Sequence, residues 1–307
     1  MWRHATPNAS ASSRFRGSAT FSSRSVGQTS RLANDLVRPQ SLRTPFALRI
    51  ARAARVFAHV LQGIATTKLV FPRVGIERRR ALIRRWSREL LAMLHVEAFV
   101  DGVSVEGLPD NLLIVANHVS WLDVFVLHSL RPSRFIGKSE LKSWPLLRHL
   151  IIGSGTLFLE RDRLRDALRI NGHARDALAS GDTIAIFPEG TTSDGTRLLP
   201  FHVSLLQPVI DAQGHVQPVA IRYRTADGAY TDAPVFVGEM NFVESLWRVL
   251  GERRFVVEVT LGPTLSARAR HRRELSREAE TFIRAALEAQ AHAPAPGTRD
   301  RLRLASR

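Results

Sequence analysis

The chain has 307 residues, of which 44% are hydrophobic, and this is enough for one large α/β domain with a packed core. It contains no cysteine, which excludes disulfide bonds, thiolate catalysis and cysteine-bound zinc. The formal net charge is +16, and nearly all of it is arginine because the chain has only three lysines; guanidinium groups suit the phosphates of lipids or of nucleic acids.

Residues 1–45 are rich in serine and arginine, contain a single acid and show no hydrophobic period. Such a segment cannot bury enough apolar surface to offset the entropy lost on ordering, so we expect it to be disordered. Its composition is similar to that of a transit peptide, and a start codon assigned too far upstream would give the same pattern. The tail, residues 291–307, is also predicted to be disordered because it is short of apolar residues and contains prolines.

Two helices are predicted between residues 46 and 95. The first contains a mostly apolar stretch, residues 56–71, which polar side chains interrupt and Pro72 ends. Because a membrane crossing needs about 20 apolar residues, this stretch is more typical of a helix that lies in or dips into one leaflet. The second helix carries apolar residues on one side and arginines around the rest. We therefore predict a membrane-associated helical pair; the alternative is an ordinary helical hairpin packed on the core.

From residue 96 to 290, short apolar runs alternate with amphipathic helices, which is typical of an α/β domain with a mixed, largely parallel sheet flanked by helices. Strands are expected at residues 98–105, 112–116, 135–137, 156–159, 183–187, 216–221 and 255–261. Helices are expected at residues 121–130, 164–179, 201–209 and 272–289.

An imidazole and a carboxylate, His118 and Asp123, stand five residues apart where the second of these strands gives way to a helix. Ser120 and Asp123 alone have a simple explanation, since Ser-x-x-Asp at a helix start is a capping box. His118 and its neighbour Asn117, however, follow a strand whose end faces the usual ligand crevice of an open α/β sheet. An aspartate one turn into the helix can hold one imidazole nitrogen and leave the other free to take a proton from a hydroxyl.

The chain has no Gly-x-Ser-x-Gly sequence, so a serine esterase of the α/β-hydrolase type is disfavoured. Direct transfer is the simpler chemistry: the base activates the hydroxyl of an acceptor, which attacks a thioester in one displacement. A second polar cluster, residues 187–193, follows the apolar strand at 183–187 and is expected to border the same site.

Four blocks of the sequence, taken in order, resemble the glycerolipid acyltransferases of the 1-acylglycerol-3-phosphate acyltransferase type. The blocks are Asn117-His118 with Asp123, Gly155 with Phe158 and Arg161, residues 187–193, and the apolar turn at 217–221. The resemblance implies transfer of a fatty acyl group from acyl-CoA or acyl carrier protein to the free hydroxyl of a lysolipid. The first expected acceptor is 1-acylglycerol-3-phosphate, which would give phosphatidic acid. His118 would be the general base, Asp123 its orienting partner, and residues 96–290 the acyltransferase domain.

Substrate binding is assigned to six residues: Asn117, Lys138, Arg161, Glu189, Gly190 and Thr191. Arg161 offers a planar fork of donors to a phosphate, and a glycine at 190 lets backbone amides approach closely. Lys138 follows a strand of the same sheet and could meet a phosphate, although a surface role explains it equally well. Thr192 stands where many phosphate-specific members of the family have arginine, which makes a related acceptor such as a lyso-ornithine lipid the alternative.

No histidines and carboxylates stand at the spacing of metal ligands, so we predict no bound metal and no cofactor beyond the thioester co-substrate. The resemblance and the basic helical pair imply a bacterial inner-membrane protein, peripheral or monotopic, with its site facing the cytoplasm. Two other classes stay open: a lipid or thioester hydrolase in which water replaces the acceptor, and a basic nucleic-acid-binding protein. The second is disfavoured because the basic excess lies beside an apolar helix with few aromatic residues interleaved.

Overall fold

The computed structural model describes residues 44–139, 147–159 and 164–293. The predictions of disorder for the two ends of the chain fall almost wholly outside this part, as does the prediction for Arg161. The side chain of Lys138 is likewise not described.

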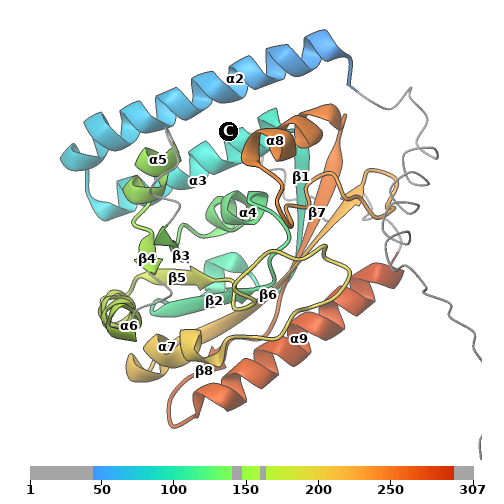
Figure 1. Cartoon of the computed structure of the whole chain (residues 1–307). Coiled ribbons are helices and arrows are strands. Elements are labelled where there is room, and N and C mark those ends of the chain that lie inside the picture. Colours follow the sequence, from blue (N-terminus) through green and yellow to red (C-terminus); the bar gives the residue numbers. More distant parts are fainter. Residues whose placement is uncertain (1–43, 140–146, 160–163, 294–307) are drawn as a thin grey trace, which may run out of the picture. The chain divides into compact units, whose positions relative to one another are not determined.

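Within the described residues, one mixed sheet of eight strands forms the centre of the fold (Figure 1). Its order is β1 (Val96–Gly102), β7 (Phe255–Leu261), β6 (His215–Thr225), β2 (Leu112–Ala116), β5 (Thr183–Ile186), β3 (Arg134–Lys138) and β4 (Leu157–Leu159), with β8 (Leu265–Ser266) beside β6. Neighbouring strands are parallel except where β6 pairs with β7 and with β8. The predicted mixed, largely parallel sheet is confirmed.

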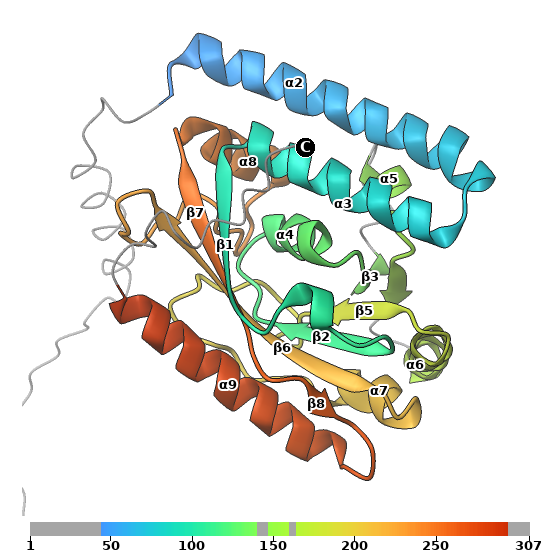
Figure 2. The same ribbon diagram turned by 180° about the vertical axis from the view of Figure 1, so that it is seen from behind.

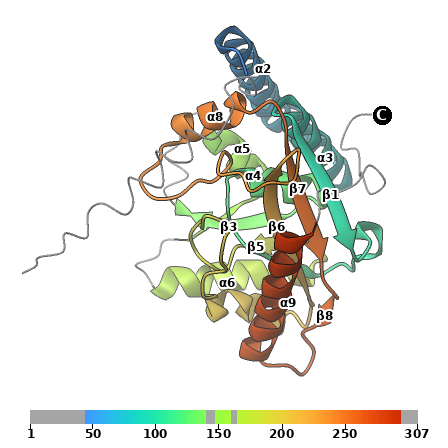
Figure 3. The ribbon, with the colours of Figure 1, turned by 90° about the vertical axis from the view of Figure 1, so that its right-hand side faces the viewer.

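Different helices cover the two faces of the sheet, as Figure 3 shows from the side. One face carries α3 (Ile76–Met93), α4 (Leu122–Leu130) and α8 (Phe242–Gly251); the other carries α6 (Leu164–Ala179), α7 (Gln207–Asp211) and α9 (Arg272–His292). Strand β2 serves both layers because its side chains alternate: Leu112, Ile114 and Ala116 join the core under α4, whereas Leu113 and Val115 join the core under α9. All five are buried, which explains why β2 reads as one continuous apolar run.

Several elements differ from the prediction. The helix expected at residues 201–209 is a 3-10 turn, Val203–Leu206, followed by the short α7, with Pro208 in its first turn where the missing N–H is tolerated. Strand β6 runs four residues beyond its predicted end, to Thr225. Three elements, β8, α5 (Leu147–Gly153) and α8, lie outside the predicted ranges; β8 is only two residues long and so leaves no period to detect.

The predicted helical pair consists of α2 (Phe46–Ala65) and α3, joined by a π turn (Thr66–Val70) and a 3-10 turn (Phe71–Arg73). His59, which interrupts the apolar stretch, faces α3: its Nε2 lies 3.0 Å from the carbonyl oxygen of Trp86, and Trp86 Nε1 donates to the carbonyl oxygen of His59 at 3.0 Å. The two rings stack with their centroids 4.6 Å apart. Helix α2 lies outside α3, as Figure 2 shows.

A buried arginine joins α2 to the remainder of the domain. The guanidinium of Arg52 donates to the carbonyl oxygens of Leu250 at 3.4 Å and Glu252 at 2.8 Å, at the carboxyl end of α8, and to Oγ1 of Thr44 at 3.1 Å. These hydrogen bonds link α2 to the carboxyl end of α8. In the part of the chain that the structure describes, every helix is too short or too polar to span a bilayer. Membrane association of the pair stays a prediction, as does the division into domains.

Candidate active site

The two polar clusters meet at the carboxyl ends of β2 and β5, which are neighbouring parallel strands. The cluster after β5 holds His118 through hydrogen bonds to its backbone and through ring stacking. The backbone N–H of His118 donates to Oε1 of Glu189 at 2.7 Å, and its carbonyl oxygen accepts from the backbone N–H of Ser193 at 2.8 Å. The imidazole stacks on the ring of Phe187, with centroids 3.8 Å apart and planes 7° from parallel. The orientation of His118 is thus set by residues about seventy positions later in the chain.

Asp123 lies in the first turn of α4 and is fully buried. Its Oδ2 accepts three hydrogen bonds, from Nδ1 of His118 at 2.9 Å and from the backbone N–H groups of Val119 at 2.7 Å and Ser120 at 2.9 Å. Its Oδ1 accepts from the hydroxyl of Tyr223 at 2.7 Å. Four donors on one carboxylate suit its ionised form, which only accepts. The sequence left two roles for Asp123, capping of the helix and orientation of the imidazole. The same carboxylate performs both.

The second ring nitrogen of His118, Nε2, lies on the side of the imidazole that faces away from Asp123. Because Asp123 is an acceptor, Nδ1 of His118 carries the hydrogen and Nε2 keeps a lone pair in the neutral ring. The His118 side chain is 20% exposed, and among the described residues no hydrogen bond is made to its Nε2. Chemically, the arrangement is a base held by an orienting carboxylate, with the acceptor nitrogen available to a substrate.

Glu189 supports the backbone on both sides of the site. Its side chain is only 4% exposed; Oε1 accepts from the N–H of His118, and Oε2 accepts from the N–H of Leu199 at 2.9 Å. Burial raises the pKa of Glu189 to about 7, the two backbone hydrogen bonds oppose the rise, and the negative charge of Asp123 adds to it. Both oxygens are therefore engaged within the protein, and the assignment of Glu189 to substrate binding stays a prediction that this geometry does not favour.

Asn117 is also turned inward, with 1% of its surface exposed. Its Nδ2 donates to the carbonyl oxygen of Ile221 at 2.9 Å, and its Oδ1 accepts from the N–H of Ile221 at 2.7 Å. Because Ile221 lies on β6, this amide continues the pairing of β2 with β6 past the end of β2. Asn117 thus supports the loop that carries His118, and its predicted contact with substrate is likewise untested.

The remaining predicted residues lie around the β5 loop or outside the described part. Gly190 adopts a φ of 67°, a left-handed conformation that favours glycine, and its N–H closes a turn onto the carbonyl oxygen of Phe187 at 3.0 Å. Thr191 is exposed, whereas Oγ1 of Thr192 donates to the carbonyl oxygen of Phe236. Lys138 ends β3 beside Leu159 of β4.

Sequence reasoning missed Tyr223, which is 100 positions from its partner Asp123. The only signal was its place on β6, where Val219, Ile221 and Tyr223 alternate onto the face covered by α4. That row is apolar except for one hydroxyl. Its meaning depends on the pairing of β6 with β2, which the sequence does not reveal.

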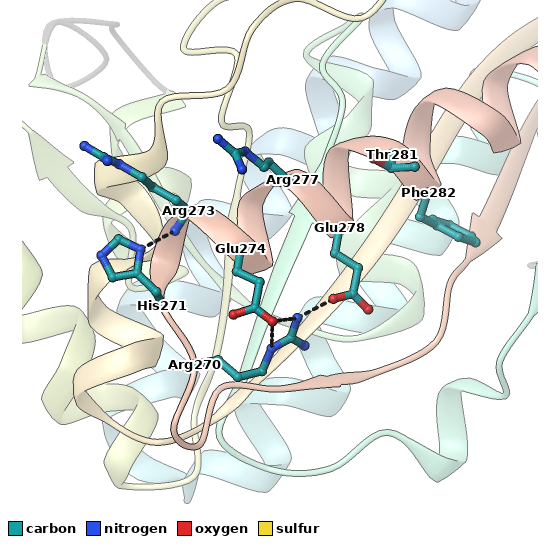
Figure 4. A pocket seen from close by; sticks show the side chains of 8 residues that line it. All are labelled: Arg270, His271, Arg273, Glu274, Arg277, Glu278, Thr281 and Phe282. Atoms are coloured by element: carbon teal, nitrogen blue, oxygen red, sulfur yellow. Dashed lines mark hydrogen bonds and ion pairs between the residues drawn. The ribbon is translucent and has the colours of Figure 1, made fainter.

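A hollow on the described surface lies away from these residues, along α9 (Figure 4). It has a volume of about 700 Å³, is widely open, and is bordered by charged side chains such as Arg270, which pairs with Glu274 and Glu278. Helix α9 covers the face of the sheet opposite to α4, and none of the predicted site residues whose side chains the structure describes lines this hollow. We therefore assign it no part in the chemistry of His118.

Comparisons with known proteins identify the family. The family model described as Acyltransferase matches residues 102–222. The 1-acyl-sn-glycerol-3-phosphate acyltransferase of Neisseria meningitidis serogroup B is 38% identical over 182 residues, which cover 59% of this chain and 70% of that protein. The lyso-ornithine lipid O-acyltransferase of Pseudomonas aeruginosa is 38% identical over 209 residues, which cover 68% of this chain and 79% of that protein. The chain belongs to the acyltransferase family.

This acyltransferase also shares its fold with a crystal structure, that of the 1-acyl-sn-glycerophosphate (LPA) acyltransferase from Thermotoga maritima. The TM-score is 0.61 at 18% sequence identity, over 80% of this chain and 97% of the other. The predictions of the family, of the fold class and of an O-acyltransferase are confirmed. The roles of individual residues in the acyltransferase, its acyl donor and the absence of a cofactor stay predictions.

Proposed function

We propose that this acyltransferase moves a fatty acyl group from an acyl thioester to the free hydroxyl of a lysolipid, with His118 as the general base. The observation that carries the proposal is the 2.9 Å contact between Nδ1 of His118 and Oδ2 of Asp123, on a ring that keeps its other nitrogen for a substrate. The names of the relatives, which refer to 1-acylglycerol-3-phosphate and to lyso-ornithine lipid, supply the class of acceptor.

In the proposed reaction, Nε2 of His118 accepts the proton of the acceptor hydroxyl while the hydroxyl oxygen attacks the carbonyl carbon of the thioester. Asp123 stabilises the imidazolium that forms. The tetrahedral intermediate then collapses, the carbon–sulfur bond breaks, and the imidazolium gives its proton to the departing thiolate. The products are an ester and a free thiol, so the step needs no covalent intermediate on the protein and no redox partner. General-base assistance of this kind contributes roughly 100- to 10,000-fold in rate.

The first acceptor is 1-acylglycerol-3-phosphate, and a lyso-ornithine lipid is the alternative. The alternative is favoured by Thr192: the position where many phosphate-specific relatives have arginine holds a hydroxyl that is engaged with the carbonyl oxygen of Phe236. A guanidinium that would pair with a phosphate is therefore missing at this point of the loop. The donor is a thioester of coenzyme A or of acyl carrier protein.

The enzyme is further proposed to work at a membrane surface, facing the cytoplasm of a bacterium. Phe46, Ile50, Phe57 and Leu61 are exposed on α2. At 3.6 residues per turn these four lie within an arc of about 60° along the helix, and we call them the outer stripe. The chain has no acid between Asp35 and Glu77, while Arg49, Arg55 and Lys68 lie near the stripe in sequence. An apolar stripe among cations is the pattern of a helix that binds anionic lipid.

A panel of lysolipids, assayed with acyl-CoA and with acyl carrier protein thioesters, tests the proposed function. We expect ester formation with 1-acylglycerol-3-phosphate or lyso-ornithine lipid, and a His118→Ala variant should lose about 100- to 10,000-fold in kcat. His173→Ala, at an exposed position of α6, is the matched control and should keep wild-type turnover. Release of free fatty acid at the same rate with and without lysolipid would instead identify a hydrolase.

A further inference from the structure

We propose that Tyr223 is a positioning residue of this acyltransferase, whose buried hydroxyl holds the Asp123 carboxylate in the orientation that receives Nδ1 of His118. The inference rests on the proposed function and adds a third residue to the pair. Tyr223 lies one residue beyond the stretch matched by the family model, 102–222. It would not touch the substrate and would act through Asp123.

The sheet brings Tyr223 to this place. Ala116, the last residue of β2, pairs with Val219 of β6, and β6 continues beyond it to Thr225. The part of β6 beyond Val219 lies beside the loop that carries His118. Every second residue of this part faces α4. Tyr223 is 3% exposed and packs against the ring of Phe255, so its hydroxyl has little freedom to turn elsewhere.

The hydroxyl has a task that no other described group performs. Oδ2 of Asp123 accepts three hydrogen bonds, but among the described residues the only donor to Oδ1 is Tyr223. Without that donor, one oxygen of a fully buried carboxylate would be unsatisfied, and the carboxylate would turn to share the remaining donors. The imidazole, whose ring plane Phe187 also holds, would then lose the hydrogen bond that fixes the direction of its Nδ1.

Tyr223 can serve as a permanent donor. Burial, together with the neighbouring charge of Asp123, raises the pKa of Tyr223 well above its usual value, so the hydroxyl keeps its proton throughout the working range. Among the described residues, the other ionisable groups that bear on Asp123 are His118, through its Nδ1, and Glu189, whose pKa the charge of Asp123 raises. A change at Tyr223 leaves the hydrogen bonds of Glu189 untouched.

The donor also tunes the proton affinity of the pair formed by His118 and Asp123. The catalytically competent state has a neutral imidazole and a net charge of −1, and a hydrogen bond to Oδ1 stabilises that state more than the protonated one. Removing the hydroxyl therefore lets the pair hold its proton to higher pH.

Tyr223→Phe is the direct test, because it removes the hydroxyl and keeps the ring. Tyr230→Phe is the matched control, since these are the only two tyrosines of the chain and the hydroxyl of Tyr230 donates to the carbonyl oxygen of Asp194 instead. We expect Tyr223→Phe to lower kcat about 10- to 100-fold, the usual worth of a hydrogen bond to a charged group, with KM for both substrates within about twofold. The acidic limb of the profile of kcat/KM against pH should move to higher pH. The control should stay within about twofold of wild type throughout.

Two further measurements separate positioning from mere stability. In an Asp123→Asn background, Tyr223→Phe should have less than about twofold effect on the residual rate, because its partner is already altered. Should Tyr223→Phe fold poorly, 3-fluorotyrosine can be incorporated into the Tyr230→Phe protein, so that residue 223 alone carries the label. The fluorinated phenol is a stronger donor and should move the acidic limb to lower pH.

The inference is overturned if Tyr223→Phe lowers the melting temperature but leaves kcat and the acidic limb unchanged, or if the fluorinated protein shows no shift. The outcome for His118→Ala is read separately. If the His118→Ala variant is active, the proposed function itself is refuted. If His118→Ala is inactive and Tyr223→Phe is unaffected, only the role of Tyr223 is refuted.

Discussion

Glu189→Gln should change how the stability of the protein depends on pH. The carboxyl group of Glu189 is buried behind His118, and burial raises its pKa from 4.5 to about 7. An acid whose pKa is higher in the folded state than in the unfolded state binds its proton more tightly on folding. Its contribution to stability is therefore fully present below pH 4.5 and is lost as the pH rises through about 7.

The size of the effect follows from the two pKa values of Glu189. A rise from 4.5 to about 7 corresponds to about 3 kcal/mol of unfolding free energy at alkaline pH. Most of this, about 2–3 kcal/mol, would be lost between pH 5 and pH 8. Glutamine has nearly the same shape and does not titrate, so the variant should lack this loss. Relative to Glu189→Gln, the wild type should become less stable by about 2–3 kcal/mol over that interval.

Urea unfolding, followed by the fluorescence of the five tryptophans at several pH values, measures the difference. Glu239→Gln is the matched control: this glutamate is exposed, and its replacement should leave the pH dependence as in the wild type. If the curves of wild type and Glu189→Gln ran parallel from pH 5 to pH 8, the argument that burial of Glu189 governs its ionisation would be refuted.

Two further predictions concern the support of the site and its environment. Asn117→Ala should lower the unfolding free energy by about 2–4 kcal/mol, because the buried N–H and C=O of Ile221 both lose their partner; a loss below about 1 kcal/mol in urea unfolding would show that water replaces the amide. The double variant Phe57→Glu and Leu61→Glu should reduce cosedimentation with anionic phospholipid vesicles by more than about tenfold, since each buried large apolar side chain contributes about 1.5–3 kcal/mol. Leu168→Glu, at an exposed leucine of α6 on the other face of the sheet, is its control, and equal binding by all three proteins would contradict the role of the outer stripe.

The contact between His118 and Asp123 could be predicted from the sequence because it is local. A strand end followed by the first turn of a helix leaves few ways to place side chains five residues apart. Tyr223 could not be predicted, since its contact depends on the order and register of strands 100 positions apart in the chain. The motif around Glu189 placed this residue at the site, but it did not show that the side chain turns into the protein. A carboxylate that contacts a substrate and one that accepts backbone N–H groups look the same in sequence, and only the burial of Glu189 separates them.

The union of α2 with α8 through Arg52 has a practical consequence for anyone who shortens the chain to obtain a better-behaved protein. Trimming away α2 would uncover the carbonyl oxygens of Leu250 and Glu252 and strip His59 from the indole of Trp86. The truncated protein would then expose apolar and unpaired polar groups that α2 had covered, and such a surface favours aggregation. Mutation of the outer stripe is a better route to higher solubility, because it leaves the contacts of α2 with α3 and α8 intact.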